Sequence, residues 1–212
     1  MTTVAALYVE TNGCYYGLPD VDPWDEARDA RLYAGPWPVV AHPPCERWGR
    51  YWSGGPSAKV RRIKGDDGNC FKRALWAVRC LGGVLEHPEA SHAWRAFGLM
   101  APPKTGGWII ADNFGGWTCC VEQGHYGHPA RKATWLYARS EFVPATPIRW
   151  GPSSGQRLDE GFHSKAERDA ARAAGVAPRK RLSKADNQRT PPAFRDLLLS
   201  IARSASRNAV AA

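Results

Sequence analysis

An apolar run that stops at two prolines constrains this chain more than any other feature of its sequence. Residues 39–41 read Val-Val-Ala, and His42, Pro43, Pro44 and Cys45 follow directly. Short β-branched runs are typical of buried strands, and the two prolines exclude a helix at the end of this one. The pattern predicts an α/β sheet with Cys45 at its carboxyl edge, where ligands bind in such folds. Cys45 is therefore a candidate nucleophile, and the alternative is a small buried side chain after a turn.

Two later segments repeat this layout of a strand followed by reactive side chains. Residues 84–88 follow a pair of glycines and predict a second short strand, in which Glu86 is an acid close to a proline. Residues 123–132 combine a glycine turn with an aromatic side chain and two cations, and residues 133–137 predict a third strand. For Glu86 the alternative is a solvated carboxylate at a strand end.

The order of these motifs resembles that of the DNA cytosine-C5 methyltransferases, over roughly residues 5–137. It is also similar to small phage-encoded relatives of these enzymes. Cys45 corresponds to the cysteine of the family's Pro-Pro-Cys motif, and Glu86 to the acid of the strand that follows, with His87 where asparagine is usual. The family's Tyr-Gly-x-Pro element with its arginine is matched by Tyr126, Gly127, Pro129 and Arg131, with Ala130 where glutamine is usual.

The resemblance implies a compact Rossmann-like sheet and a covalent mechanism with Cys45, Glu86 and Arg131 as catalytic residues. In the family, the cysteine adds to C6 of a pyrimidine while the glutamate holds and protonates N3. The chemistry of the pyrimidine ring agrees with this mechanism, because C5 is a poor nucleophile until a thiolate has added at C6. A cation lowers the pKa of a nearby thiol, and we expect Arg131 to approach Cys45. The alternative for Arg131 and Lys132 is a charged turn.

The resemblance also implies S-adenosylmethionine as cofactor. The family's Phe-x-Gly-x-Gly loop has a partial counterpart within residues 5–18, where two glycines remain. Residues 20–34 predict a turn and a short charged helix instead of a helix and a strand, so this half of the domain is shortened or rebuilt. Helix capping is the alternative for its acids. The candidate cofactor-binding residues are Glu10, Gly13, Gly17 and Asp22.

Length and composition limit the organisation of the chain. With 212 residues and 43% hydrophobic content, one α/β core is expected over residues 1–145, and a basic linker with a helical extension that packs back on the core over 146–212. Within these parts, residues 71–79 and 193–203 have helical spacing. No long apolar run or secretion signal is evident, which predicts a cytoplasmic protein without membrane contact, in the host cell if it is phage-encoded.

Six cysteines in such a compartment are expected to be reduced thiols. Zinc is the rival explanation for His42 with Cys45, and for the pair Cys119-Cys120 near His125 and His128. Because the chain contains no Cys-x-x-Cys pair, we predict no metal site.

A formal net charge of +9 makes DNA the expected partner. The loop 46–69 is rich in glycine and arginine, and loops of this length are usually functional or disordered. A solvated linker is the alternative for the basic run near residue 180. The candidate substrate- and DNA-binding residues are Arg47, Arg50, Arg61, Arg62, Tyr126, Lys132, Arg179, Lys180 and Arg181.

The sequence therefore predicts a DNA cytosine C5-methyltransferase-like enzyme. Two other classes stay open. A catalytically silent DNA-binding relative would explain the sparse glycines near the amino terminus. A pyrimidine nucleotide-modifying enzyme would explain why little of the chain is left for a target-recognition domain.

Overall fold

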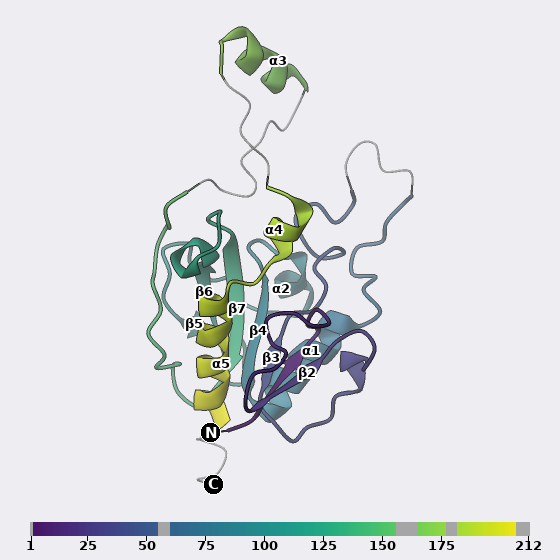
Figure 1. Cartoon of the computed structure of the whole chain (residues 1–212), viewed down its shortest axis with the longest axis vertical. Coiled ribbons are helices and arrows are strands. Elements are labelled where there is room, and N and C mark those ends of the chain that lie inside the picture. The colour runs from purple at the N-terminus through teal and green to yellow at the C-terminus, as the bar shows by residue number, and fades with distance from the viewer. Residues whose placement is uncertain (1, 55–59, 156–164, 177–181, 207–212) are drawn as a thin grey trace.

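The computed structural model describes residues 2–54, 60–155, 165–176 and 182–206, in which a seven-stranded mixed sheet carries helices on both faces (Figure 1). The strand order is β2-β1-β3-β4-β7-β6-β5. The strands are β1 (Val4–Leu7), β2 (Val21–Trp24), β3 (Val39–Ala41), β4 (Gly83–Pro88), β5 (Ile109–Ile110), β6 (Gly116–Glu122) and β7 (Ala133–Arg139). The helices are α1 (Cys70–Leu81), α2 (His92–Ala96), α3 (Lys165–Ala173), α4 (Lys184–Gln188) and α5 (Pro192–Ser206), with 3-10 turns η1 (Ala30–Leu32) and η2 (Gln123–Tyr126).

The sheet has a parallel half and an antiparallel half. Strands β2, β1, β3 and β4 run parallel, whereas β7, β6 and β5 are joined to β4 and to one another by antiparallel pairing. In the parallel half, Val40 pairs with Ala6 on one side and with Val84 on the other. Both faces of these strands are covered, which explains why β1 and β3 are entirely apolar and buried.

Two amphipathic helices cover the opposite faces of the sheet. Helix α1 buries the side chains at positions 71, 74, 75 and 78, a spacing of one helical face, against β3 and β4. Helix α5 lies on the other face against β1, β3, β4 and β7 and buries Phe194, Leu198 and Ile201. The helices expected from residues 71–79 and 193–203 are therefore both present.

The prediction for residues 20–34 was wrong in one respect. Strand β2 lies there and pairs in parallel with β1, followed by the short turn η1. Asp22 and Pro23 both disfavour strands. However, β2 is the outermost strand, and an edge position tolerates a proline that cannot donate to the ladder. The connection from β1 to β2 contains no helix, so this half is short, as the sequence indicates.

Among the residues described, none of the helices is long and apolar enough to cross a membrane.

Candidate active site

A cavity of about 1100 Å³ opens at the carboxyl edge of the parallel strands. The chain leaves β1 for β2 on one side and later returns to β3 on the other, so this edge contains a topological switch point, where α/β folds bind ligands. The loops after β1 and β3, the end of β4 and the start of β7 form the walls. Residues 185–190, in α4 and in the segment that leads to α5, close one side.

Cys45 lines this cavity four residues beyond β3. Its carbonyl oxygen accepts hydrogen bonds from the amides of Trp48 at 3.0 Å and Gly49 at 2.7 Å, which turns the chain away from the sheet. The side chain is exposed at the cavity wall. The surrounding protein and the Glu86 carboxylate raise the pKa of the thiol, whereas Lys132 acts in the opposite direction.

Glu86 reaches the same cavity from the middle of β4, because side chains alternate between the two faces of a strand. Its neighbour His87 points to the opposite face and packs against Phe71 and Trp94. Burial holds the pKa of His87 down at about 4. Burial also opposes ionisation of Glu86, but the hydrogen bond and charge of His42 outweigh it, with help from Lys132, so the pKa of Glu86 is lowered.

Lys132 supplies the cation of the site. It lines the cavity just before β7, and its backbone has a left-handed φ of 35°, which turns the chain into the strand. Burial lowers the pKa of Lys132, while the nearby Glu86 and Cys45 raise it. The sequence prediction assigned the role beside the thiol to Arg131, and the structure gives that place to the next residue.

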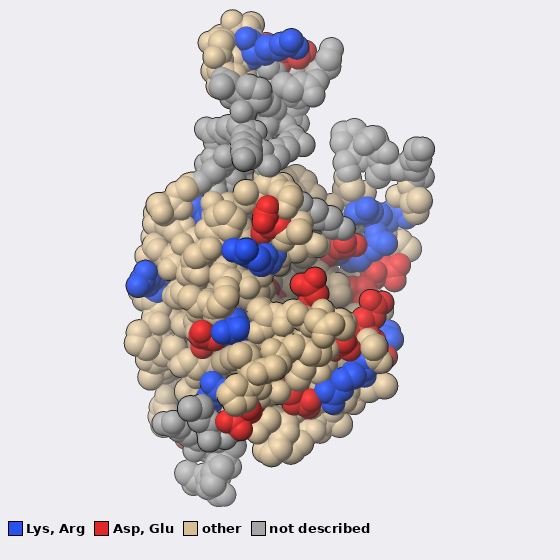
Figure 2. Space-filling view, viewed as in Figure 1, with Lys and Arg blue, Asp and Glu red and all other residues tan. Residues whose placement is uncertain are grey.

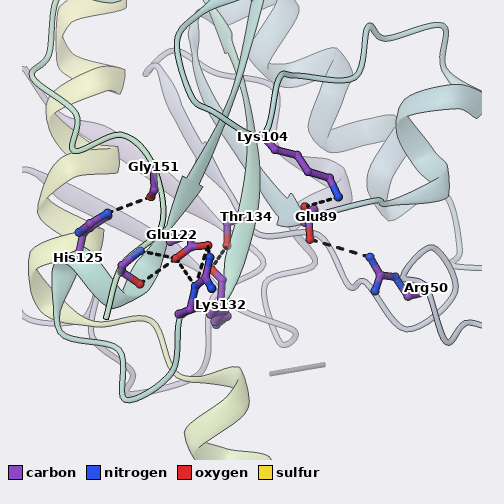
Figure 3. A network of polar contacts seen from close by, with 10 residues as sticks. Arg50, Glu89, Lys104, Glu122, His125, Lys132, Thr134 and Gly151 are labelled. Atoms are coloured by element: carbon purple, nitrogen blue, oxygen red, sulfur yellow. Dashed lines mark hydrogen bonds and ion pairs between the residues drawn. The ribbon is translucent and has the colours of Figure 1, made fainter. Parts of the chain in front are cut away.

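Arg131 is held elsewhere. Its guanidinium donates to both carboxylate oxygens of Glu122, at 2.7 to 3.1 Å, and the same carboxylate accepts bonds from the amide and hydroxyl of Ser153. Figure 3 shows this cluster around Glu122. It also shows a separate group, in which Glu89 contacts Arg50 and Lys104. Arg131 does not line the cavity.

Two cavity residues, Tyr15 and His42, were not predicted as part of a catalytic site. The hydroxyl of Tyr15 lies 2.8 Å from His42 Nε2, and His42 Nδ1 lies 3.1 Å from Glu86 Oε2. Gln123 also donates to Glu86, from Nε2 to Oε1 at 3.3 Å. The sequence singled out His42 only as a metal ligand, and its place next to the Pro-Pro-Cys turn was the available signal. No local pattern pointed to Tyr15.

The predicted cofactor-binding residues are brought together only in part, since Glu10 and Gly13 share one loop and Gly17 and Asp22 do not contact them in the described structure. Of the four, Glu10 lines the cavity. Gly13 lies in the same loop but its amide donates to the Glu10 carbonyl, and an added Cβ would meet that backbone oxygen at 2.9 Å. The Asp22 carboxylate accepts hydrogen bonds from Trp24, on β2, and from Arg28, in the loop after β2. Gly17 has a φ of 71° and open space around it. Thus Gly13, Gly17 and Asp22 do not form a cradle for S-adenosylmethionine.

The loop after Cys45 places cations and aromatic rings at the cavity mouth. Arg50, Arg62, Tyr51 and Trp52 line the cavity. Arg61 is exposed beside them, whereas Arg47 is half-buried and outside the lining. Figure 2 shows lysine and arginine gathered beside the hollow on this face, with acidic side chains among them.

The other residues predicted to bind DNA lie apart from this mouth or outside the described chain. The Tyr126 hydroxyl accepts a bond from the Arg149 amide, and its ring packs against Phe194 of α5. Arg179, Lys180 and Arg181 lie outside the described residues.

No group of three or more His, Cys, Asp or Glu side chains suited to a metal ion occurs in the described part of the chain. Cys119 lies on the face of β6 that packs under α5, and burial raises the pKa of its thiol well above the usual value.

Comparison of the chain with protein-family models, with curated proteins and with solved structures yields no match.

Proposed function

We propose that this protein modifies C5 of a pyrimidine in DNA by covalent catalysis, as an enzyme of the cytosine methyltransferase type. One observation carries the proposal: Cys45, in the loop after β3, and Glu86, on the neighbouring parallel strand β4, line the same cavity at the switch point of an α/β sheet. A nucleophilic thiol and an acid are the two groups that this chemistry requires. The parallel strand order β2-β1-β3-β4 with helices on both faces also supports a Rossmann-like core.

The proposed chemistry activates C5. The Cys45 thiolate forms a bond from Sγ to C6 of the ring, and the electron pair of the C5–C6 double bond moves onto C5 and into the ring. Glu86 acts as the acid: its carboxyl group donates a proton to N3, which neutralises the negative charge that develops on the ring. Lys132 favours the thiolate. Once C5 carries its new substituent, water accepts the proton of C5, the electrons of that C–H bond restore the C5–C6 double bond, and the bond from C6 to Sγ breaks to release the Cys45 thiolate. N3 returns its proton to Glu86.

The described residues supply the groups that activate C5. They do not supply a recognisable site for the donor of the new group. S-adenosylmethionine would supply a methyl cation equivalent, but three of the four residues predicted to hold it do not line the cavity. No step is therefore assigned to a methyl donor. The cavity of about 1100 Å³ is slightly larger than most small-molecule sites and exceeds what one base requires.

DNA is the proposed substrate because arginines and aromatic rings line the mouth of the cavity. Arginines attract phosphates, and aromatic faces stack on bases that have left the duplex. A paired base has to be flipped to reach Cys45, at a cost of a few kcal/mol. Arg50, Arg62 and Trp52 at the mouth are suited to hold the displaced strand.

Covalent trapping tests the proposal. The wild-type protein is incubated with S-adenosylmethionine and either a duplex that contains 5-fluorocytosine or free 5-fluorodeoxycytidine monophosphate, and denaturing gels with peptide mass spectrometry locate any adduct. We expect an adduct on Cys45 with the duplex, none in Cys45→Ser, and wild-type yield in Cys80→Ser, since Cys80 is exposed outside the cavity. An adduct with the mononucleotide alone would favour the nucleotide-modifying enzyme. DNA binding without any adduct would favour the silent relative and overturn the proposal.

A further inference from the structure

Three side chains from distant parts of the chain form a row of hydrogen bonds along the wall of the cavity. Tyr15 comes from the loop after β1, His42 directly follows β3, and Glu86 lies on β4. The Tyr15 hydroxyl lies 2.8 Å from His42 Nε2, and His42 Nδ1 lies 3.1 Å from Glu86 Oε2. The side chains of His42 and Glu86 are only 13% and 14% exposed. The middle member of this row is a histidine, the side chain that gains and loses a proton near neutral pH.

Glu86 has to carry a proton when it acts as an acid, but its surroundings favour the ionised form. Burial raises the pKa of Glu86, and the hydrogen bond and charge of His42 outweigh burial, so that the pKa is lowered. The carboxyl group is therefore ionised before a base binds. It needs a proton from a neighbouring group at the moment when negative charge develops on N3.

Two of the described side chains donate hydrogen bonds to the Glu86 carboxylate. Gln123 donates from Nε2 to Oε1 at 3.3 Å, but its amide holds on to its protons. His42 faces Oε2 with Nδ1, and an imidazolium readily gives up a proton. Lys132 also carries protons nearby, but its hydrogen bonds go to two backbone carbonyls at the end of α4. Of the described residues, His42 is therefore the one from which a proton can pass directly to the carboxylate.

We propose that His42 is a positioning residue that holds the proton of the acid: as an imidazolium it keeps this proton while the site is empty and passes it to Glu86 when the thiolate adds to the base. This inference rests on the proposed function. Oε2 of Glu86 takes the proton from Nδ1, whose N–H electron pair stays on the imidazole. The resulting carboxyl group gives its proton to N3 as the electrons arrive there. When Cys45 leaves, the proton returns by the same route.

Tyr15 determines which ring proton of His42 can leave. The Nε2–H of an imidazolium donates to the Tyr15 hydroxyl oxygen. Burial raises the pKa of Tyr15 well above its usual value, so the hydroxyl stays neutral. A neutral hydroxyl accepts a hydrogen bond but does not take the proton. The proton on Nε2 therefore stays in place, and the proton on Nδ1, which faces the carboxylate, is the one that moves.

The titratable groups that act on this row come from every segment packed against it. In the described chain they are Cys14 in the loop after β1, Cys45 after β3, His87 on β4, Lys132 before β7, and Arg195 and Asp196 on α5. Burial raises the pKa values of Cys14 and Cys45 and lowers that of His87 to about 4, so these three are uncharged at pH 7 before a base binds. The Glu86 carboxylate is the negative charge in direct contact with His42, and it favours the imidazolium.

Chemical rescue tests whether His42 supplies a proton. In His42→Ala, the rate of adduct formation with the 5-fluorocytosine duplex should fall about a hundredfold, at the lower end of the contribution of a general acid. Added imidazole can enter the space beside Glu86 and should restore a large part of the rate. The 1,3-dimethylimidazolium ion carries the same charge without an N–H proton and should restore none of it. Equal rescue by both compounds would show that charge alone is required and would overturn the proposal.

Two further variants control this experiment. His42→Asn keeps an N–H close to the position of Nδ1, but its amide cannot release a proton. This variant should be about as slow as His42→Ala and should gain nothing from imidazole. His92→Ala lies outside the cavity and should keep the wild-type rate with and without imidazole. A folded His42→Asn variant with the wild-type rate would show that a hydrogen bond is sufficient, which would also overturn the proposal.

The second test needs no substrate. Nitrogen-15 NMR of the protein labelled at the histidine ring nitrogens, with His42→Asn for assignment, shows which nitrogens carry a proton. We expect His42 to keep both ring protons to a higher pH in the wild type than in Glu86→Gln, because the amide lacks the negative charge that favours the imidazolium. A wild-type ring that carries one proton at every pH between about 5 and 8 would overturn the proposal.

The two tests separate this inference from the function on which it rests. If the wild type forms no adduct with any base, the proposed function fails and with it the transfer to N3, while the NMR experiment still reports whether His42 holds a proton beside Glu86. If the wild type forms the adduct on Cys45 and folded His42→Ala forms it at the same rate, the function stands and the role of His42 fails.

Discussion

Lys132 Nζ donates a hydrogen bond of 3.1 Å to the carbonyl oxygen of Arg189, 57 positions away in the sequence. A second, longer bond of 3.4 Å reaches the carbonyl of Gln188. These contacts attach the end of α4 to the wall of the cavity and hold the ammonium where it acts on Cys45 and Glu86. The cation of the site is therefore positioned by the carboxyl-terminal part of the chain, outside the region of the family resemblance.

The first prediction concerns the reactivity of the Cys45 thiol. Because Lys132 lowers its pKa and Glu86 raises it, Lys132→Met should move the pH profile of alkylation by iodoacetamide to higher pH, and Glu86→Gln should move it to lower pH. At pH 7, the first variant should react more slowly than wild type and the second faster. Mass spectrometry of the Cys45 peptide measures the rate, with exposed Cys80 in the same sample as the reference. Shifts in the same direction for both variants would refute this electrostatic account.

The second prediction concerns the loop at the cavity mouth. Neutralisation of Arg61 and Arg62 together should weaken binding to a duplex and reduce the slope of log K against log salt by about 0.9 for each phosphate that the protein no longer neutralises. Fluorescence anisotropy at several KCl concentrations measures the slope. Arg28→Gln is the control, because Arg28 is paired with Asp22 next to β2. If the double variant keeps the wild-type slope, these arginines do not bind phosphate.

The third prediction concerns acid stability near β2. Hydrogen bonds from Tyr16 and Thr11 lower the pKa of Asp25 from 3.8 to about 2. A lowered folded-state pKa stabilises the protein above the ordinary value of the group, and that contribution is lost as the pH falls from about 4 towards 2. Tyr16→Phe should raise the pKa of Asp25 and lose less stability over this interval than wild type. Urea unfolding at pH 7, 4 and 3 measures the difference, and parallel losses in both proteins would contradict it.

The fourth prediction concerns the turn between α1 and β4. A Cβ at Gly83 would overlap the backbone of Val39 in the neighbouring strand, and the φ of 117° is unfavourable for other residues. Gly83→Ala should therefore cost more than about 3 kcal/mol of unfolding free energy. Gly98 also has a positive φ, of 68°, but open space around it, so Gly98→Ala should cost only about 1 to 2 kcal/mol. Urea unfolding compares the two, and equal costs would show that the close approach to Val39 is unimportant.

The local sequence pattern determined several secondary-structure elements of this protein and two of its candidate site residues. The run before Pro43-Pro44 predicts β3 and the cysteine beyond it, because β-branched residues and prolines act on their own backbone. The spacing of apolar residues predicts α1 and α5, because one face of each helix must be buried whatever the partner is. Glu86 was also found this way, from a short strand that ends at a proline.

Only the tertiary structure decided which side chains meet in the cavity. Tyr15 and His42 are 27 positions apart, and His42 and Glu86 are 44 apart, so no periodicity links them. Strand β2 exists despite Asp22 and Pro23, because pairing with β1 at the sheet edge overrides weak local propensity. The neighbouring residues 131 and 132 also have different roles because they meet different partners in the tertiary structure. Arg131 is bound by the Glu122 carboxylate, whereas Lys132 lines the cavity with Cys45.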